Sequence, residues 1–170
     1  DGFQDKYYKG QRPNSIYIPR FRNIPGDPSS KGDYLRGFGY QGGASRGDWT
    51  QHIKELNLGK PMKEMTQEPG PWKMVILAFG ETLPYHSNKM TLNKEVTDIN
   101  GMPTVTFDVE WKENELKMRK DMVSDGVEML EASGFSAVRP MDMMSYPGQA
   151  IHEMGTARMG RDPKTSVLNK

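Results

Sequence analysis

The sequence predicts an α+β fold in which a mostly antiparallel sheet is covered on one face by helices. Three observations support this prediction. Segments of strand length follow one another in pairs joined by turn residues, which favours neighbouring strands of opposite direction. One long amphipathic segment comes after them, and strands and helices do not alternate as in a parallel βαβ series. At 170 residues, the chain is long enough for one domain with a core of its own.

Two strands and a short helix are expected in the first half of the chain. Residues 15–22 place apolar side chains between polar ones, and Pro19 indicates an edge strand or a bulge because it lacks a backbone donor. Residues 23–32 are rich in proline, glycine and serine and should form a loop. The aromatic and glycine-rich residues 34–45 indicate a strand that another backbone or a ligand approaches closely. A helix is expected at residues 48–58.

Further strands are expected after residue 71. Residues 72–79 form a near-continuous apolar run, which is typical of a strand covered on both faces. Residues 89–99 and 102–111 flank Asn100 and Gly101, a dipeptide that favours a two-residue hairpin turn. The second arm alternates apolar and polar residues, so one set of side chains should share a buried face: Val105, Phe107, Val109 and Trp111.

Residues 114–133 form the clearest predicted helix. Apolar side chains recur there at helical spacing, and Gly134 is placed to end the helix. We expect this helix to cover the apolar face of the 102–111 arm, and residues 135–140 to add one further strand. The side chains predicted to share its buried face are Leu116, Met122, Val123, Val127, Met129 and Leu130.

Composition excludes several classes of function. The chain has 23 basic and 22 acidic side chains, a net charge of +1 and no dense basic stripe, so nucleic acid is not an expected partner. It has no cysteine, which excludes disulfides and thiolate metal sites. No apolar run reaches the roughly 18 residues that a membrane span needs.

Two patterns resemble binding sites, but the residues around them do not fit such sites. Gly37, Gly39 and Gly42 have the spacing of a dinucleotide-binding loop, but the preceding residues are polar and no helix follows at once, so a glycine-rich strand is the better interpretation. His52 and His86 lack the spacing of paired metal ligands, and we interpret them as a surface residue and a structural turn residue. No metal site is expected.

The third histidine, His152, stands in a patterned stretch. Residues 150–162 read AIHEMGTARMGRD, in which a histidine, two separated glycines, a threonine and a methionine occur in the register H-x-x-G-T-x-x-M-G. This stretch resembles the glucose-methanol-choline (GMC) oxidoreductases. A second pattern of the same family supports the resemblance: Glu81 and Pro84, followed by Asp98, Gly101 and Pro103.

The resemblance implies an FAD-dependent enzyme whose substrate-binding domain is built on an antiparallel sheet of about six strands. The chain, residues 1–170, is then expected to be a fragment of that domain. The FAD-binding domain, the C-terminal end and a second catalytic residue would lie outside it. These residues alone are therefore not expected to bind FAD or to be active.

The resemblance also implies roles for individual residues. His152 matches the family histidine that takes up the proton of the substrate hydroxyl while hydride leaves the same carbon, and histidine is the residue type whose ordinary pKa suits that task. Gly155 and Thr156 would let the backbone pass close to the flavin. Arg158 would either anchor a neighbouring segment, through a structural ion pair, or contact the cofactor.

Substrate and location are implied only in outline. The subgroup with this motif favours a sugar, a polyol or another alcohol as substrate, with a cytochrome or other electron-transfer subunit as a possible partner and the periplasm rather than the cytoplasm as location. The alternative hypothesis is a freestanding carbohydrate-binding or interaction module without catalysis. Its stacking platform would be formed by Tyr34, Phe38, Tyr40 and Trp49.

Overall fold

The computed structural model describes residues 15–46, 72–146, 152 and 154–168. The chain divides into two compact units, residues 1–81 with 117–141 and residues 82–116 with 142–170. Within the described part, the first unit contains a three-stranded sheet and the second a two-stranded sheet. The expectation of α+β architecture with antiparallel strands is confirmed, whereas the single sheet of about six strands is wrong. The predicted helix at 48–58 lies outside the described residues.

The sheet of the first unit has the order β1-β2-β3, and all its pairings are antiparallel. Its strands are β1 (Ile16–Ile18), β2 (Phe38–Arg46) and β3 (Trp72–Gly80), with a short 3-10 helix, η1 (Pro28–Ser30), between the first two. β1 lies at an edge of the sheet and ends directly before Pro19, as its sequence predicts.

A glycine in β2 permits close approach of the neighbouring strand. A Cβ atom at Gly42 would lie 2.1 Å from the backbone oxygen of Val75 in β3, which no real side chain tolerates. Gly39 and Gly42 both lie within β2. The prediction of a closely approached glycine-rich strand is therefore confirmed, and the approaching group is backbone rather than a phosphate.

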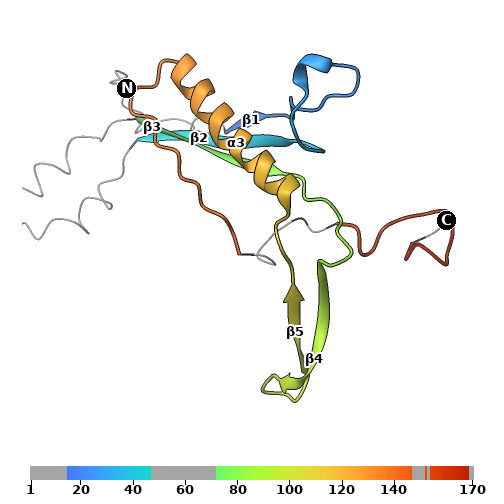
Figure 1. The fold of residues 1–170 in the computed structure, drawn as a ribbon. Helices are drawn as coiled ribbons and strands as arrows, with labels where there is room; N and C mark the ends of the chain where they lie inside the picture. Colours follow the sequence, from blue (N-terminus) through green and yellow to red (C-terminus); the bar gives the residue numbers. More distant parts are fainter. Residues whose placement is uncertain (1–14, 47–71, 147–151, 153, 169–170) are drawn as a thin grey trace, which may run out of the picture. The chain divides into compact units, whose positions relative to one another are not determined.

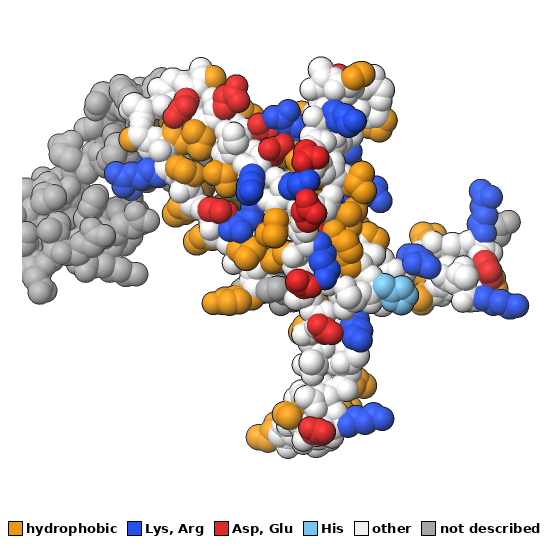
Figure 2. All heavy atoms as spheres, viewed as in Figure 1, with side chains coloured by type: hydrophobic (Ala, Val, Ile, Leu, Met, Phe, Trp, Pro, Cys, Tyr) orange, Lys and Arg blue, Asp and Glu red, His pale blue; other side chains and the backbone are white. Residues whose placement is uncertain are grey.

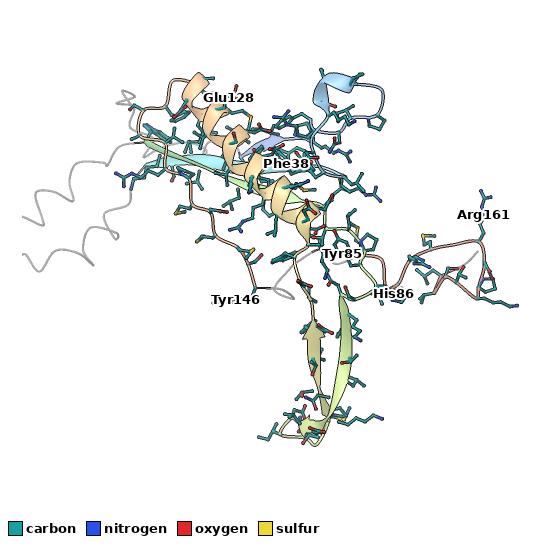
Figure 3. All side chains as sticks on the ribbon, in the orientation of Figure 1. Phe38, Tyr85, His86, Glu128, Tyr146 and Arg161 are labelled. Atoms are coloured by element: carbon teal, nitrogen blue, oxygen red, sulfur yellow. The ribbon has the colours of Figure 1, made fainter. Side chains whose placement is uncertain are left out.

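The core of the first unit lies between this sheet and α3 (Glu113–Ala132), most of which belongs to the unit. Figure 1 shows α3 running across one side of the sheet, and Figure 3 labels Phe38 at this crossing. The Phe38 ring meets that of Tyr40 edge to face, with centroids 5.6 Å apart. Four residues form the buried cluster: Tyr34, Phe38, Tyr40 and Met118.

Three members of the proposed stacking platform are thus in the core. Phe38 and Tyr40 are each 2% exposed and Tyr34 is 9% exposed, so their faces are not available to a sugar. The interpretation of these residues as a platform is wrong; Trp49 lies outside the described residues. Burial raises the pKa of Tyr40, whose hydroxyl donates a hydrogen bond of 2.8 Å to the carbonyl oxygen of Met122 in α3.

A partly buried ion pair joins α3 to the segment after β1. Arg22 donates from Nε to Asp125 Oδ2 at 2.8 Å and from Nη2 to Oδ1 at 2.5 Å, the two-pronged geometry that guanidinium and carboxylate prefer. Asp125 is 7% exposed, and the guanidinium carbon lies 5.7 Å from the ring centre of Phe21. Because Asp125 is largely removed from water, its carboxylate depends on the guanidinium of Arg22, whose side chain is 29% exposed.

The predicted helix is confirmed, but not all of its predicted face. Met122 and Met129 pack against the core, and Leu116 is 42% exposed. The most buried side chain is Met118 at 1%. Helical periodicity alone assigns the buried face to apolar residues. It could not predict that Asp125 is buried, because that depends on Arg22, 103 positions away in the sequence.

The end of α3 is the Schellman motif expected of a C-terminal glycine. Gly134 has a φ of 87°, its N–H bonds to the carbonyl oxygen of Glu131, and the N–H of Phe135 bonds to that of Leu130. The strand predicted at 135–140 is wrong. Ala137 adopts a φ of 78° there, which interrupts any extended run.

β3 is a strand, as predicted, but is not covered on both faces. Val75 and Leu77 are each 53% exposed and Phe79 is 46% exposed. Trp72, Met74 and Ile76 are partly buried, and Ile76 packs against the core. An apolar run predicts the strand, but it does not show which residues cover each face.

The second unit contains the hairpin of β4 (Lys89–Thr97) and β5 (Pro103–Asp108). Its loop has three residues rather than the predicted two. The N–H of Gly101 bonds to the carbonyl oxygen of Asp98, and the N–H of Asp98 bonds to that of Met102. Gly101 has a φ of 78°, whereas Asn100 does not have positive φ. A type I turn followed by a left-handed glycine explains this loop.

The prediction that α3 covers the hairpin face is wrong, because the buried side of α3 belongs to the core of the first unit. Val105 is 47% exposed and Phe107 is 55% exposed, and α3 packs on β1–β3 instead. β5 ends at Asp108, so Val109 and Trp111 lie beyond the strand. Trp111 donates from its indole nitrogen to the carbonyl oxygen of Ser145 at 3.2 Å.

Candidate functional site

His152 lies on the surface of the second unit. It is exposed and has a φ of 75°, in the left-handed region that a few per cent of non-glycine residues adopt, histidine more often than most. Three residues later Gly155 has a φ of 108°, and nothing would lie within 4 Å of a Cβ atom there. Thr156 is also exposed. The first half of the motif therefore presents an imidazole, open space beside Gly155 and a hydroxyl at the surface.

The second half of the motif forms a closed loop. Arg158 donates from Nη2 to the carbonyl oxygen of Thr165 at 2.8 Å. Met159 forms a parallel bridge with Leu168, supported by a 2.9 Å bond from the N–H of Gly160 to the Leu168 carbonyl. The guanidinium of Arg158 thus bonds to a neighbouring segment of the same loop. Figure 3 labels Arg161 within this loop.

The last glycine of the motif is required by close packing inside the loop. A Cβ atom at Gly160 would lie 2.6 Å from Cβ of Ser166. The Ser166 hydroxyl donates to the carbonyl oxygen of Asp162 at 2.6 Å, which holds the turn between them. Sequence reasoning did not single out Ser166 or Thr165, and the spacing from Asp162 to them is the turn signal that could have found them.

The second family pattern contains residues with clear structural roles. Asp98 Oδ1 accepts from the N–H of Asn100 at 2.8 Å and from that of Met102 at 2.9 Å, so this carboxylate fixes the hairpin loop. Glu81 belongs to the first unit, where its carboxylate lies 3.0 Å from Arg20 Nη1. Asp98 thus shapes the backbone of its turn, whereas Glu81 forms an ion pair with another side chain.

Glu115 is an anchor that the sequence analysis missed. Its carboxylate accepts from the N–H of Leu83 at 3.0 Å and from that of Lys112 at 3.2 Å. The pKa of Tyr85 is raised mainly by loss of hydration and also by the hydrogen bond with Glu115. Tyr85 directly precedes the exposed His86 (Figure 3). The signal was present, because a glutamate three residues after a helix N-cap commonly bonds back to the cap.

Within the described part of the chain, no group of three or more histidine, aspartate or glutamate side chains is arranged to bind a metal ion. None of the described helices is both long and apolar enough to cross a membrane. A shallow hollow in the first unit contains no motif residue and is lined by Asn23, Ile24, Gly26, Asp27, Pro28 and Lys31.

Comparison with known families identifies the chain. A model of the GMC oxidoreductase family matches residues 84–170, just over half of the sequence. The matched range contains the β4–β5 hairpin, α3 and the whole His152 motif. The chain belongs to the GMC oxidoreductase family.

Two curated relatives are named as dehydrogenases. The chain is 27% identical to 2-methyl-1,2-propanediol dehydrogenase of Mycolicibacterium austroafricanum, over 96% of this chain and 30% of that protein. It is 28% identical to the gluconate 2-dehydrogenase flavoprotein of Pantoea cypripedii, over 55% of this chain and 16% of that protein. The chain therefore spans less than a third of the length of either relative. No solved structure matches it significantly.

Proposed function

We propose that residues 1–170 are the substrate-binding portion of an FAD-dependent oxidoreductase that oxidises the CH–OH group of a small alcohol, polyol or sugar. One observation carries this proposal: the family match covers residues 84–170, a range that contains the H-x-x-G-T-x-x-M-G motif and its flanks. The name of one relative includes the word flavoprotein, which supports FAD as the cofactor of the longer protein.

The residues present fit FAD as one wall of its site. Gly155 has open space where a Cβ would be, so a planar ring could approach the backbone there, and Thr156 offers a hydroxyl beside it. Arg158 already donates to Thr165 from one guanidinium nitrogen, so a contact with the cofactor would use another. Because these exposed residues supply only one wall, we propose that the 170 residues alone do not retain FAD.

His152 is the proposed proton acceptor. When bound, FAD would supply a two-electron acceptor for the hydride that leaves the carbinol carbon. An imidazole nitrogen of His152 would take the hydroxyl proton, so the alcohol becomes a carbonyl compound as its C–H and O–H bonds break. The imidazole is exposed, so an alcohol and a facing surface can both reach it.

The proposed substrate class is supported by chemistry that the two relatives' names share. Both name a small hydroxylated molecule, 2-methyl-1,2-propanediol in one case and gluconate in the other. We extend that class to this protein, with sugars and polyols preferred. A cytochrome or another electron-transfer subunit as acceptor, and a periplasmic location, are parts of the same proposal.

The test uses the whole protein that contains this chain, purified with its flavin. Candidate alcohols are added without air, and bleaching of the flavin absorbance reports hydride transfer; the panel contains 2-methyl-1,2-propanediol, gluconate, glucose and simple alcohols. We expect at least one polyol or sugar to bleach the flavin. A protein that purifies without flavin, or whose flavin no member of the panel reduces, would contradict the proposal. Reoxidation by oxygen or by an added cytochrome then identifies the acceptor.

A further inference from the structure

The β4–β5 hairpin is a ribbon with one apolar face. Met90 pairs with Phe107 across the two strands, and Leu92 pairs with Val105. Because side chains two apart on a strand share a face, these four side chains form a continuous apolar surface, which we call the ribbon face. Their exposed fractions are 59% for Met90, 63% for Leu92, 47% for Val105 and 55% for Phe107.

The opposite face of the same ribbon is polar. Thr91 pairs with Thr106, and Lys89 pairs with Asp108. Apolar residues on one face and polar residues on the other are the pattern of a sheet with one covered side and one wet side. Figure 2 shows hydrophobic side chains at the surface of the hairpin.

Such a ribbon needs a permanent cover. β4 and β5 pair only with each other in the described part of the chain, and an isolated two-stranded hairpin is at best marginally stable in water. A partner that binds and leaves would expose the ribbon face in each cycle. The cover must therefore be present whenever the hairpin is folded.

We propose that the ribbon face is covered by apolar side chains of the same polypeptide that lie outside these 170 residues. This proposal rests on the proposed function, in which the chain is one portion of a longer flavoprotein. The diol dehydrogenase aligns with 96% of this chain, yet the alignment covers 30% of that relative, so most of the relative's length lies outside it. A segment of the same polypeptide is present in every folded molecule, which a second copy or a separate partner is not.

The first test measures whether the ribbon face is covered in the whole protein. The 170 residues contain no cysteine, so Leu92→Cys adds one thiol on the ribbon face and Thr91→Cys adds a matched thiol on the polar face. We expect Leu92→Cys to react with a maleimide about tenfold or more slowly than Thr91→Cys in the native protein, since labelling must wait for local opening. The two thiols should react alike in denaturant. Equal native rates would overturn the proposal.

The second test identifies the cover. Benzoylphenylalanine replaces Phe107 on the ribbon face, with Thr106 replaced as the control, and the cross-linked peptides are sequenced after irradiation. We expect the Phe107 probe to cross-link within one polypeptide to a segment outside the 170 residues. A cross-link to a second copy, to another protein or to residues 1–170 overturns the proposal. Flavin content and substrate reduction are measured on the same sample, so failure of the proposed function is seen separately.

Discussion

In the described residues the first unit has a buried core, although β3 also exposes apolar side chains, and the second unit has no residue in that core. In the first, Phe38 and Tyr40 are each 2% exposed beneath α3, and Tyr40 and Arg22 both bond to that helix. In the second, Leu92 and Phe107 are more than half exposed. A unit with its own core can keep its shape alone, whereas a unit with an exposed apolar ribbon depends on other surfaces. The difference assigns the scaffold to the first unit, whereas the chemistry that we propose for His152 belongs to the second.

The largest expected effect separates chemistry from scaffold. In the whole protein, His152→Ala should lower the rate of flavin reduction by about 10²–10⁴, the usual contribution of a positioned acid or base. FAD content should change little, because an imidazole that serves the substrate is not a main anchor of the cofactor. Rapid-mixing absorbance with excess substrate measures the rate. His86→Ala, another exposed histidine of the same unit, is the control.

An alanine variant that reduces its flavin at nearly the parent rate would mean that His152 is structural. The proton acceptor would then lie outside these residues, and the proposal that the second unit contains a catalytic residue would be wrong.

The next effect concerns the first unit alone. Asp125→Ala leaves the partly buried guanidinium of Arg22, 29% exposed, without its partner, which should lower the free energy of unfolding of the first unit by about 2–4 kcal/mol, less than for a fully buried pair. Hydrogen exchange of the β2 and α3 amides measures the change. Asp33→Ala is the matched control, because it also removes an ion pair with α3, from Lys117, but at the surface. Equal loss of protection in both variants would show that burial does not decide the strength of these pairs.

A smaller effect tests the close approach of two strands. Gly42→Ala places a methyl group against the Val75 carbonyl and should cost about 1–3 kcal/mol as the strands move apart. At the adjacent Gly43 the nearest atom to a Cβ, Cα of Ser15, is 4.0 Å away, so Gly43→Ala should be neutral or slightly stabilising. Thermal unfolding of both variants compares them. A neutral Gly42→Ala would mean that β2 and β3 adjust without cost.

Local patterns predicted most of the elements. The hairpin, α3 with its terminal Gly134, and the glycine-rich strand follow from turn chemistry, helical periodicity and the lack of a side chain, all of which act within a few residues. The motif around His152 could be recognised because it is also local: its members lie within nine residues. The roles proposed for them remain predictions.

What the sequence could not predict depends on partners far along the chain. Asp125 is buried because Arg22 reaches it, and the exposed side of β3 depends on what covers that side. Tyr34, Phe38 and Tyr40 suggested a binding platform because aromatic residues serve cores and binding surfaces equally well. Only the arrangement of α3 over the sheet distinguishes the two uses.

The smallest effect compares two glycines that differ in location but not in geometry. Gly101 in the hairpin loop and Gly134 after α3 have φ values of 78° and 87°, and nothing lies within 4 Å of a Cβ at either. Alanine at either position should therefore cost about 1–2 kcal/mol, the strain of a left-handed residue. In the whole protein we expect Gly134→Ala to reduce the hydrogen-exchange protection of α3 and β2, and Gly101→Ala to reduce that of β4 and β5 alone. If Gly101→Ala also weakened α3 and β2 to the same extent, the two units would open together, and the contrast between a self-supporting scaffold and a dependent ribbon would not hold.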